Sequence, residues 1–286
     1  MKTGFNMLLW TPFVTGEYFY LFERLKNTGY DGVEIPLFNG DAAHYREVGR
    51  ALSDSGLACT AVTVIPDQAH NPISPVPEAR QGARDYLNWA VDCCAALGAE
   101  VLCGPFYQPL GVFAGRGPTE EEKERAAEMH RDIAGIAQQA GVLLALEPLN
   151  RFECYFLNTL RDTVEYVKRV DHPNLKAMYD TFHGNIEEKD PVGCIADAVD
   201  LLGHFHISAT DRGTPGRDHV DWPGTFRVLR ESGYDGWLTI EAFGRVMPDL
   251  AATTCVWRDL SGSTEEVYEE GYRLMADGWA RAGQTK

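Results

Sequence analysis

The 286-residue chain lacks the features that mark several common classes of protein. Its seven cysteines show no C-x-x-C spacing and no even framework, which argues against a zinc-binding or disulfide-stabilised scaffold and favours reduced thiols. No apolar run is long enough to span a bilayer, and the first residues, MKTGFNMLLWTPF, do not resemble a cleavable signal. These absences predict a cytoplasmic protein that has no membrane partner.

Positive charge is also scarce. The chain has 26 Lys and Arg residues against 42 Asp and Glu residues, so its formal net charge is −16. An acidic surface repels the phosphate backbone, which disfavours nucleic acid as a partner and, with it, a DNA-repair endonuclease. What remains is an acidic enzyme of a length that a single barrel domain of roughly 250 residues can accommodate.

Strand and helix patterns alternate along the chain without a low-complexity linker. Thr119 and Glu122 form a capping box that opens a helix to about Gln139, and Ser263 with Glu266 opens the last helix. Because the strands are apolar on both faces, the pattern predicts one (β/α)₈ barrel, a TIM barrel, over residues 1–286. An open doubly wound sheet is the alternative, disfavoured because no G-x-G-x-x-G follows the first strand. The eight predicted strands are 4–10, 32–36, 57–64, 100–106, 142–148, 175–180, 202–208 and 237–241.

One short phrase occurs near both ends of the chain, as GYDGVEIP (residues 29–36) and GYDGWLTIE (residues 233–241). Each copy follows the polar end of a predicted helix, so Gly29 and Gly233 are expected to be left-handed caps. The apolar residues that follow indicate short buried strands. The phrase is therefore interpreted as a repeated joint between a helix and a strand, and only the second strand ends on an acid, Glu241.

Charged residues close four consecutive predicted strands, at Glu147, Asp180, His206 and Glu241, with separations of 33, 26 and 35 residues. In a barrel, the carboxyl ends of the strands carry the active site. Three carboxylates gathered there without a cation would raise one another's pKa, and a divalent metal removes that repulsion. Oxygen ligands with one nitrogen and no thiolate suit Mn²⁺, Mg²⁺ or Co²⁺. The alternative for each residue is a solvated ion pair at the barrel rim.

The chain resembles the D-tagatose 3-epimerase family, which includes the D-psicose (allulose) and L-ribulose 3-epimerases. The resemblance implies one divalent metal, commonly Mn²⁺, held by Glu147, Asp180, His206 and Glu241. It also implies substrate-binding roles for Glu153, His183 and Arg212, and a homodimer or homotetramer. The stretches that carry it are GPFYQPLGVFAGRGPTEEE (104–122), LALEPLNRFECYFLNT (144–159), MYDTFHGNIEE (178–188), HFHISATDRGTPG (204–216) and LTIEAF (238–243).

The implied reaction is epimerisation of a ketose at C3, which removes the proton next to the C2 carbonyl and returns one to the opposite face. A divalent ion at the C2 and C3 oxygens would stabilise the developing cis-enediolate. Glu147 and Glu241, three strands apart, are the expected catalytic acid and base on the two faces. His183 and Arg212 are expected to hold the keto end, and Glu153 to tune the proton affinity of a catalytic glutamate. No phosphate-binding glycine loop follows the last strands, so an unphosphorylated ketose is predicted.

Two other functions stay open. A metal-dependent aldose–ketose or hydroxypyruvate-type isomerase could use the same barrel, and a non-catalytic metal and sugar binding protein would lack one of the flanking carboxylates.

Two further residues lie outside the predicted ligand set. Glu34, within GVEIP, is a candidate for a hydrogen bond near the metal site. His204, on the same strand face as His206 but deeper, is interpreted as a core or supporting residue.

Overall fold

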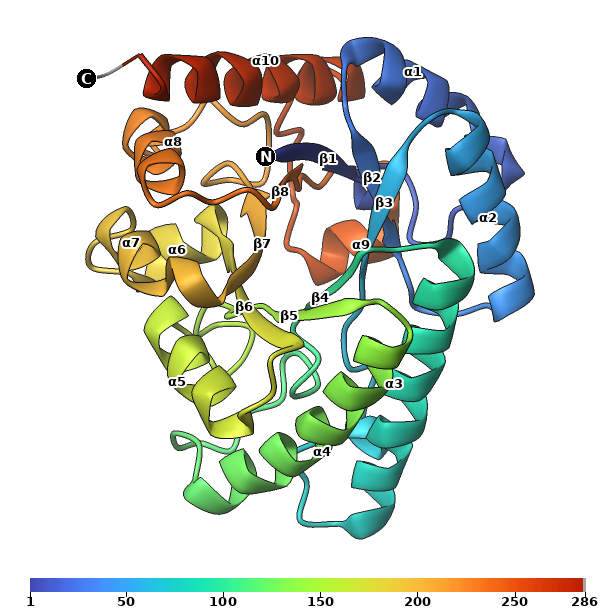
Figure 1. Ribbon diagram of the computed structural model, residues 1–286, viewed down its shortest axis with the longest axis vertical. Helices are drawn as coiled ribbons and strands as arrows, with labels where there is room; N and C mark the ends of the chain where they lie inside the picture. The colour runs from blue at the N-terminus through green and yellow to red at the C-terminus, as the bar shows by residue number, and fades with distance from the viewer. Residues whose placement is uncertain (285–286) are drawn as a thin grey trace.

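The computed structural model describes residues 1–284, and in it eight parallel strands close into a barrel. Each strand pairs with its neighbour in chain order, and β1 closes the ring by pairing with β8. Figure 1 shows the helices arranged around this ring. The predicted (β/α)₈ barrel is confirmed, and the open sheet is excluded. The strands are β1 (Lys2–Asn6), β2 (Gly32–Pro36), β3 (Ala58–Val62), β4 (Val101–Gly104), β5 (Leu143–Leu146), β6 (Leu175–Asp180), β7 (Leu202–Ile207) and β8 (Trp237–Ile240).

Six of the α-helices in the described part of the chain begin after a residue whose side chain accepts a free backbone N–H of the first turn. Thr119 and Glu122 form the predicted capping box of α4, and Ser263 accepts from the backbone N–H of Glu266 at the start of α10. The α-helices are α1 (Tyr20–Thr28), α2 (Ala42–Asp54), α3 (Pro77–Leu97), α4 (Glu120–Gln139), α5 (Leu160–Val170), α6 (Thr181–Glu187), α7 (Gly193–Ala198), α8 (Trp222–Glu231), α9 (Pro248–Thr253) and α10 (Thr264–Ala282). Short 3-10 turns are η1 (Met7–Leu9), η2 (Gly16–Tyr18), η3 (Gln68–His70) and η4 (Val199–Leu201).

The repeated phrase forms the same joint twice. Gly29 caps α1 with φ 119°, and Gly233 follows α8 with φ 75°, so both lie in the left-handed region that favours glycine. β2 and β8 begin a few residues later. The prediction of two left-handed caps is confirmed, and these joints place β2 and β8 on either side of β1.

Most strands are shorter than their apolar runs. The first was predicted over 4–10, but it ends at Asn6, whose side-chain oxygen accepts from the backbone N–H of Leu8 at 2.8 Å and caps η1. In the same way β5 and β8 end one residue before Glu147 and Glu241. Asn6, Glu147 and Glu241 therefore lie where the strand ladder ends, and Asn6 Nδ2 donates to Glu241 Oε1 there.

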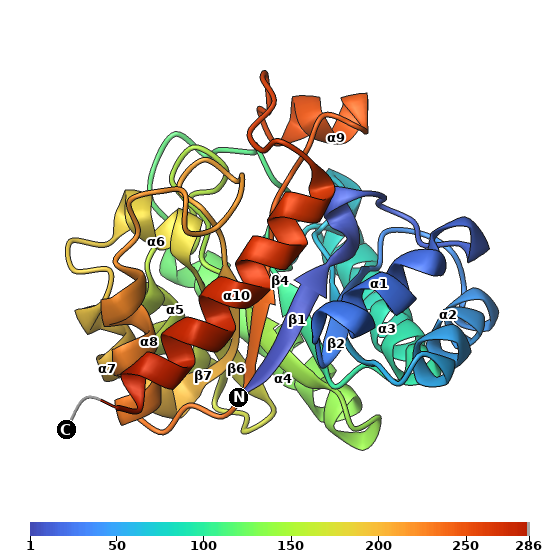
Figure 2. The ribbon, with the colours of Figure 1, turned by 90° about the horizontal axis from the view of Figure 1, so that it is seen from above.

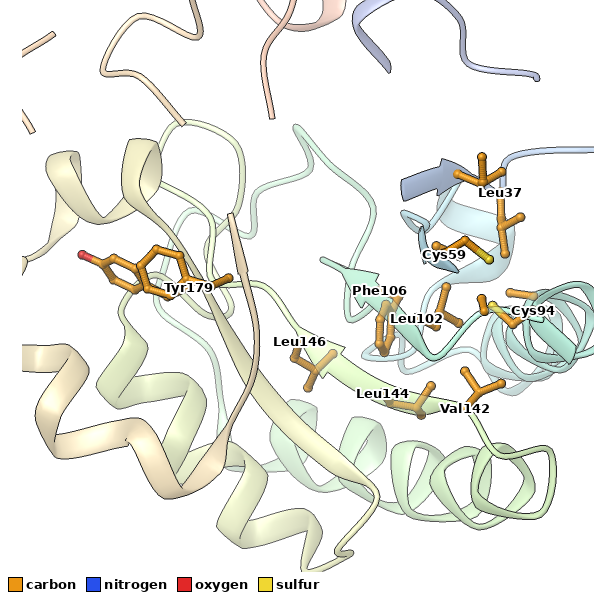
Figure 3. Close-up of a cluster of buried hydrophobic side chains, with 14 of the residues drawn as sticks. Leu37, Cys59, Cys94, Leu102, Phe106, Val142, Leu144, Leu146 and Tyr179 are labelled. Carbon is orange, nitrogen blue, oxygen red and sulfur yellow. The ribbon is translucent and has the colours of Figure 1, made fainter. Parts of the chain in front are cut away.

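Apolar side chains fill the space between the barrel wall and the surrounding helices. Figure 3 shows Leu102, Leu144 and Leu146 from β4 and β5 in one such cluster, with Cys94 from α3. All four side chains are fully buried, and each leucine contributes roughly 1.5–3 kcal/mol by leaving water. The strands therefore present their apolar residues outward to the helices as well as inward, which is why they appear in the sequence as continuous apolar runs.

One segment lies apart from the wall. Figure 2 shows α9 and the chain around it beyond the carboxyl ends of the strands.

Among the described residues, no helix combines the length and the apolar character needed to cross a bilayer.

Candidate active site

The four residues predicted as metal ligands lie together at the carboxyl end of the barrel. One ligand atom from each of Glu147, Asp180, His206 and Glu241 lies within 4.8 Å of the others, and all four residues are buried. We call this group the outer cluster. His206 Nδ1 is 3.5 Å from Glu241 Oε2 and 3.9 Å from both Glu147 Oε1 and Asp180 Oδ2. The imidazole therefore faces all three carboxylates.

Two carboxyl groups of the outer cluster have opposite electrostatic surroundings. Burial and the negative charge of Glu241 raise the pKa of Glu147 well above its usual value. Burial would also raise the pKa of Glu241, but the positive charges of His206 and Arg212 outweigh it and lower that pKa. A pair of carboxyl groups with divergent pKa values can supply one proton acceptor and one proton donor.

Two atoms of the outer cluster are buried without a hydrogen bond to any described residue: Glu147 Oε1 and His206 Nδ1. Buried polar atoms without a partner are costly, so native structures seldom keep them unless something else binds there. Here both atoms face Asp180 and Glu241. A donor set of carboxylate oxygens and one imidazole nitrogen fits a divalent ion such as Mn²⁺, Mg²⁺ or Co²⁺.

Arg212 supplies the positive charge nearest to these carboxylates. Its Nη1 donates to Asp180 Oδ2 and to Glu241 Oε2, each at 2.6 Å. The guanidinium lies 4.0 Å from the ring centre of Phe182 and 5.0 Å from that of Phe243, so its planar faces are covered by aromatic rings. The backbone of Arg212 has φ 67°, an uncommon value for a residue other than glycine, and the surrounding contacts maintain it.

His183 lies beside Arg212, and Glu153 is linked to it through Asn150. Arg212 Nη2 is 2.9 Å from His183 Nε2, and the Asn150 backbone N–H donates to His183 Nδ1 at 3.1 Å. Burial and the charge of Arg212 lower the pKa of His183 to about 3, so the ring is neutral. Asn150 Nδ2 also donates to Glu153 Oε1 at 2.6 Å. The three residues predicted to bind substrate thus border the outer cluster as one connected group.

A second buried group lies deeper in the barrel and shares His206 with the first. Glu34, Cys103, His204 and His206 form this inner cluster, and each is buried. Glu34 Oε1 accepts from His206 Nε2 at 2.8 Å, and Glu34 Oε2 lies 2.8 Å from His204 Nε2. Burial alone would raise the pKa of Glu34, yet His206 and His204 together hold it well below its usual value. The buried carboxylate is therefore ionised.

Sequence reasoning placed Glu34 near the site only as a candidate and missed Cys103 altogether. The available signal was a carboxylate in the middle of an apolar strand, between Val33 and Ile35. Such a residue must face away from its two neighbours and find donors inside the barrel. His204 is fully buried, as expected of a core or supporting residue.

Comparison with known proteins places the chain among sugar epimerases. The family model described as xylose isomerase-like TIM barrel matches residues 22–278. A ketose 3-epimerase of Arthrobacter globiformis is 33% identical over 280 residues, which are 97% of this chain and 96% of the relative. A D-psicose 3-epimerase of Ruminiclostridium cellulolyticum is 32% identical over 270 residues, covering 93% of this chain and 92% of the relative.

A solved structure agrees with these sequence relationships. The crystal structure of D-psicose 3-epimerase with D-tagatose from Clostridium cellulolyticum H10 superposes with a TM-score of 0.87 at 29% identity, covering 99% of each chain. The predicted resemblance to the ketose 3-epimerases is confirmed. The chain belongs to the xylose isomerase-like TIM barrel family, as an enzyme of the isomerase class related to the ketose 3-epimerases.

Proposed function

We propose that this protein is a metal-dependent ketose 3-epimerase that acts on a free sugar. One observation carries the proposal: Glu147 and Glu241 lie in the outer cluster beside two buried atoms, Glu147 Oε1 and His206 Nδ1, that have no partner among the described residues. Relatives named as ketose, D-psicose and L-ribulose 3-epimerases support the assignment of the reaction.

The two glutamates would exchange a proton with C3 from opposite faces of the sugar. One of Glu147 and Glu241 would act as the base that removes the proton while the other acts as the acid that returns one. The reverse reaction exchanges the roles, because the acid of one direction is the base of the other. Glu147, Asp180, His206 and Glu241 would hold one divalent ion, Mn²⁺ in our proposal, which stabilises the negative charge that develops on the substrate oxygens.

Arg212 and His183 would orient the keto end of the substrate. Arg212 offers a planar set of N–H donors next to Asp180 and Glu241, and the neutral His183 ring lies 3.8 Å from Glu147 Oε1. Glu153 accepts a hydrogen bond from Asn150 Nδ2. Burial raises the pKa of Glu153, and the positive charge of Arg212 opposes that rise. We propose that Glu153 tunes the proton affinity of a catalytic glutamate. The homodimer or homotetramer implied by the resemblance stays a prediction.

The test is isotope exchange at C3. Metal-stripped protein is incubated with D-fructose, D-tagatose or L-ribulose in D₂O, with and without Mn²⁺, and the recovered sugars are analysed by NMR. We expect Mn²⁺-dependent deuterium at C3 together with the C3 epimer, and the three rates would rank the substrates. Glu241→Gln, treated identically, should show neither.

Other outcomes would assign a different reaction. Deuterium at C1 or C2, or an aldose product formed without exchange, would indicate an aldose–ketose isomerase on the same barrel. Tight binding of Mn²⁺ and sugar with no turnover of any of the three ketoses would indicate a binding protein. Either result would replace the epimerase proposal.

A further inference from the structure

We propose that Glu34 is a positioning residue for the metal site: it fixes the His206 ring so that Nδ1 faces the outer cluster as an unprotonated ligand. The inference rests on the metal site of the proposed function, but not on the sugar or on the reaction. Glu34 touches none of the three outer carboxylates, so its role would be exerted through His206 and Asn6.

The surroundings of Glu34 satisfy the carboxylate completely. Its Oε1 accepts from His206 Nε2 at 2.8 Å and from Asn6 Nδ2 at 2.9 Å. Its Oε2 accepts from Thr60 Oγ1 at 2.8 Å and from Cys103 Sγ at 3.2 Å, and lies 2.8 Å from His204 Nε2. Donors on four side chains thus converge on one buried group, while His204 Nε2 lies close to Oε2 without hydrogen-bond geometry. A carboxylate held from so many directions has one position available to it.

That position determines which ring nitrogen of His206 carries the proton. Each Glu34 oxygen already accepts from an N–H or O–H donor, Asn6 Nδ2 on Oε1 and Thr60 Oγ1 on Oε2, so Glu34 is also the acceptor in its hydrogen bond with His206 and the proton lies on Nε2. In the neutral ring the lone pair then lies on Nδ1, the atom that faces Glu147, Asp180 and Glu241. A carboxylate behind a histidine ligand fixes the tautomer, orients the ring and raises its basicity.

Asn6 extends the same support to Glu241. Its Nδ2 donates to Glu34 Oε1 and also to Glu241 Oε1, at 3.1 Å. Its Oδ1 is held in turn by the backbone N–H of Leu8, so the amide cannot rotate freely. One oxygen of Glu241 is thereby occupied, while the other, Oε2, faces His206 and Arg212. Glu34 and Asn6 together set the orientation of two of the four outer groups.

The inner cluster could instead hold a second metal ion, but its distances disfavour this. Donor atoms around a tetrahedral ion with bonds of about 2.0–2.1 Å lie roughly 3.3 Å apart. Glu34 Oε1 is 2.8 Å from His206 Nε2, to which it is hydrogen-bonded, and Glu34 Oε2 is 2.8 Å from His204 Nε2. Both separations are shorter than donor atoms around one ion would show.

The experiment measures Mn²⁺ binding directly, by electron paramagnetic resonance of the free ion, in wild type and Glu34→Gln. We expect one Mn²⁺ per chain in wild type and a Kd that is about 10–100-fold higher in the variant. Thr239→Val is the matched control: Thr239 is buried in β8, and its hydroxyl has no hydrogen-bond partner among the described residues. The control should bind Mn²⁺ with wild-type affinity.

A measurement on unmodified protein keeps the inference testable if Glu34→Gln does not fold. Nitrogen-15 NMR of histidine side chains in Zn²⁺-loaded wild type should show His206 protonated at Nε2. A proton on Nδ1, or a Glu34→Gln variant whose Kd for Mn²⁺ lies within twofold of wild type, would overturn the inference. So would a second Mn²⁺ in wild type that is lost in the variant. Because no sugar is used, a failure of the epimerase proposal would appear separately, as tight Mn²⁺ binding without exchange at C3.

Discussion

The inner and outer clusters share the His206 ring but differ in how their charge is balanced. In the inner cluster one carboxylate, Glu34, is surrounded by donors and has a lowered pKa. In the outer cluster three carboxylates face one side of His206, only Asp180 and Glu241 pair with Arg212, and Glu147 has a raised pKa. Both clusters are buried.

The difference shows that burial alone does not make a reactive carboxyl group. Glu34 accepts hydrogen bonds from four donors and its oxygens have no capacity left for a ligand, although both ring nitrogens of the neighbouring His204 lack a hydrogen bond to any described residue. Glu147 Oε1 has no hydrogen bond to any described residue, and neither has the neighbouring His206 Nδ1. An excess of negative charge and incomplete hydrogen bonding together favour a cation there. The predictions below test this contrast.

The largest effect is expected from Glu147→Gln, which keeps the shape of the side chain and removes its proton-transfer capacity. Epimerisation at C3 should fall about 10³-fold, equivalent to about 4 kcal/mol in the activation barrier. Rates are measured at an Mn²⁺ concentration shown by titration to saturate the variant, so that weaker metal binding does not account for the loss. Thr239→Val serves again as the control. A variant that retains a tenth of the wild-type rate would contradict the role of Glu147.

A smaller effect is expected when the cation of the outer cluster is removed. Arg212→Met leaves Asp180 and Glu241 without their ion-pair partner and should lower the free energy of unfolding by about 3 kcal/mol in metal-free protein. Saturating Mn²⁺ should reduce this loss to roughly half, because the ion supplies the missing positive charge. Urea unfolding with and without Mn²⁺ measures both values.

The control for that experiment is Arg217→Met. Arg217 also pairs with two carboxylates, Glu266 and Glu270, but it is 57% exposed, so the loss should stay below about 1 kcal/mol with or without Mn²⁺. Equal losses for Arg212→Met in the presence and absence of Mn²⁺ would show that its charge is unrelated to the metal site.

The smallest effect concerns Glu122, a satisfied carboxylate outside both clusters. Its oxygens accept from Arg116 at 2.8 and 3.0 Å and from the Thr119 backbone N–H at 2.8 Å, and its pKa is lowered to about 2, chiefly by the hydrogen bonds from Arg116. Because the folded-state pKa lies below that of the unfolded chain, this stabilisation is complete above about pH 5 and is lost as the pH falls toward 2.

Glu122→Gln should therefore lower the free energy of unfolding by about 1–2 kcal/mol at pH 7. The difference from wild type should shrink steadily below pH 4 in urea titrations. Glu128→Gln, on the exposed face of the same helix, is the matched control. A difference that stays constant down to pH 3 would contradict the assigned cause.

The outer cluster could be predicted from the sequence because barrel topology alone brings strand ends together. Asp180 closes β6, and Glu147 and Glu241 follow β5 and β8 by one residue, so their neighbourhood depends only on strand order. The two glycine caps were equally predictable, since a left-handed residue after a helix has few alternatives to glycine.

Of the inner cluster, the sequence indicated Glu34 and His204 only as separate residues. Their meeting with Cys103 and His206 could not be predicted, because it depends on contacts through the interior of the barrel. Glu34 and His206 are 172 residues apart and lie on strands that are not neighbours. Their meeting depends on the stagger of the strands around the ring, which no local pattern specifies. The ion pairs of Arg212 with Asp180 and Glu241 also could not be predicted from a local pattern. The backbone of Arg212 is left-handed, a conformation that arginine seldom adopts.

Asn6 and Glu34 belong to β1 and β2, whereas the residues of the outer cluster belong to β5 through β8 or follow them directly. This division has a consequence for exchanging parts between barrels. A recombinant half-barrel beginning at β5 would carry all four proposed ligands, yet it would have no acceptor behind His206 Nε2 and no donor to Glu241 Oε1. A chimaera that joins the second half of this barrel to the first half of another protein therefore needs an amide at the position of Asn6 and a carboxylate at the position of Glu34. We expect chimaeras without them to fold and to bind metal loosely.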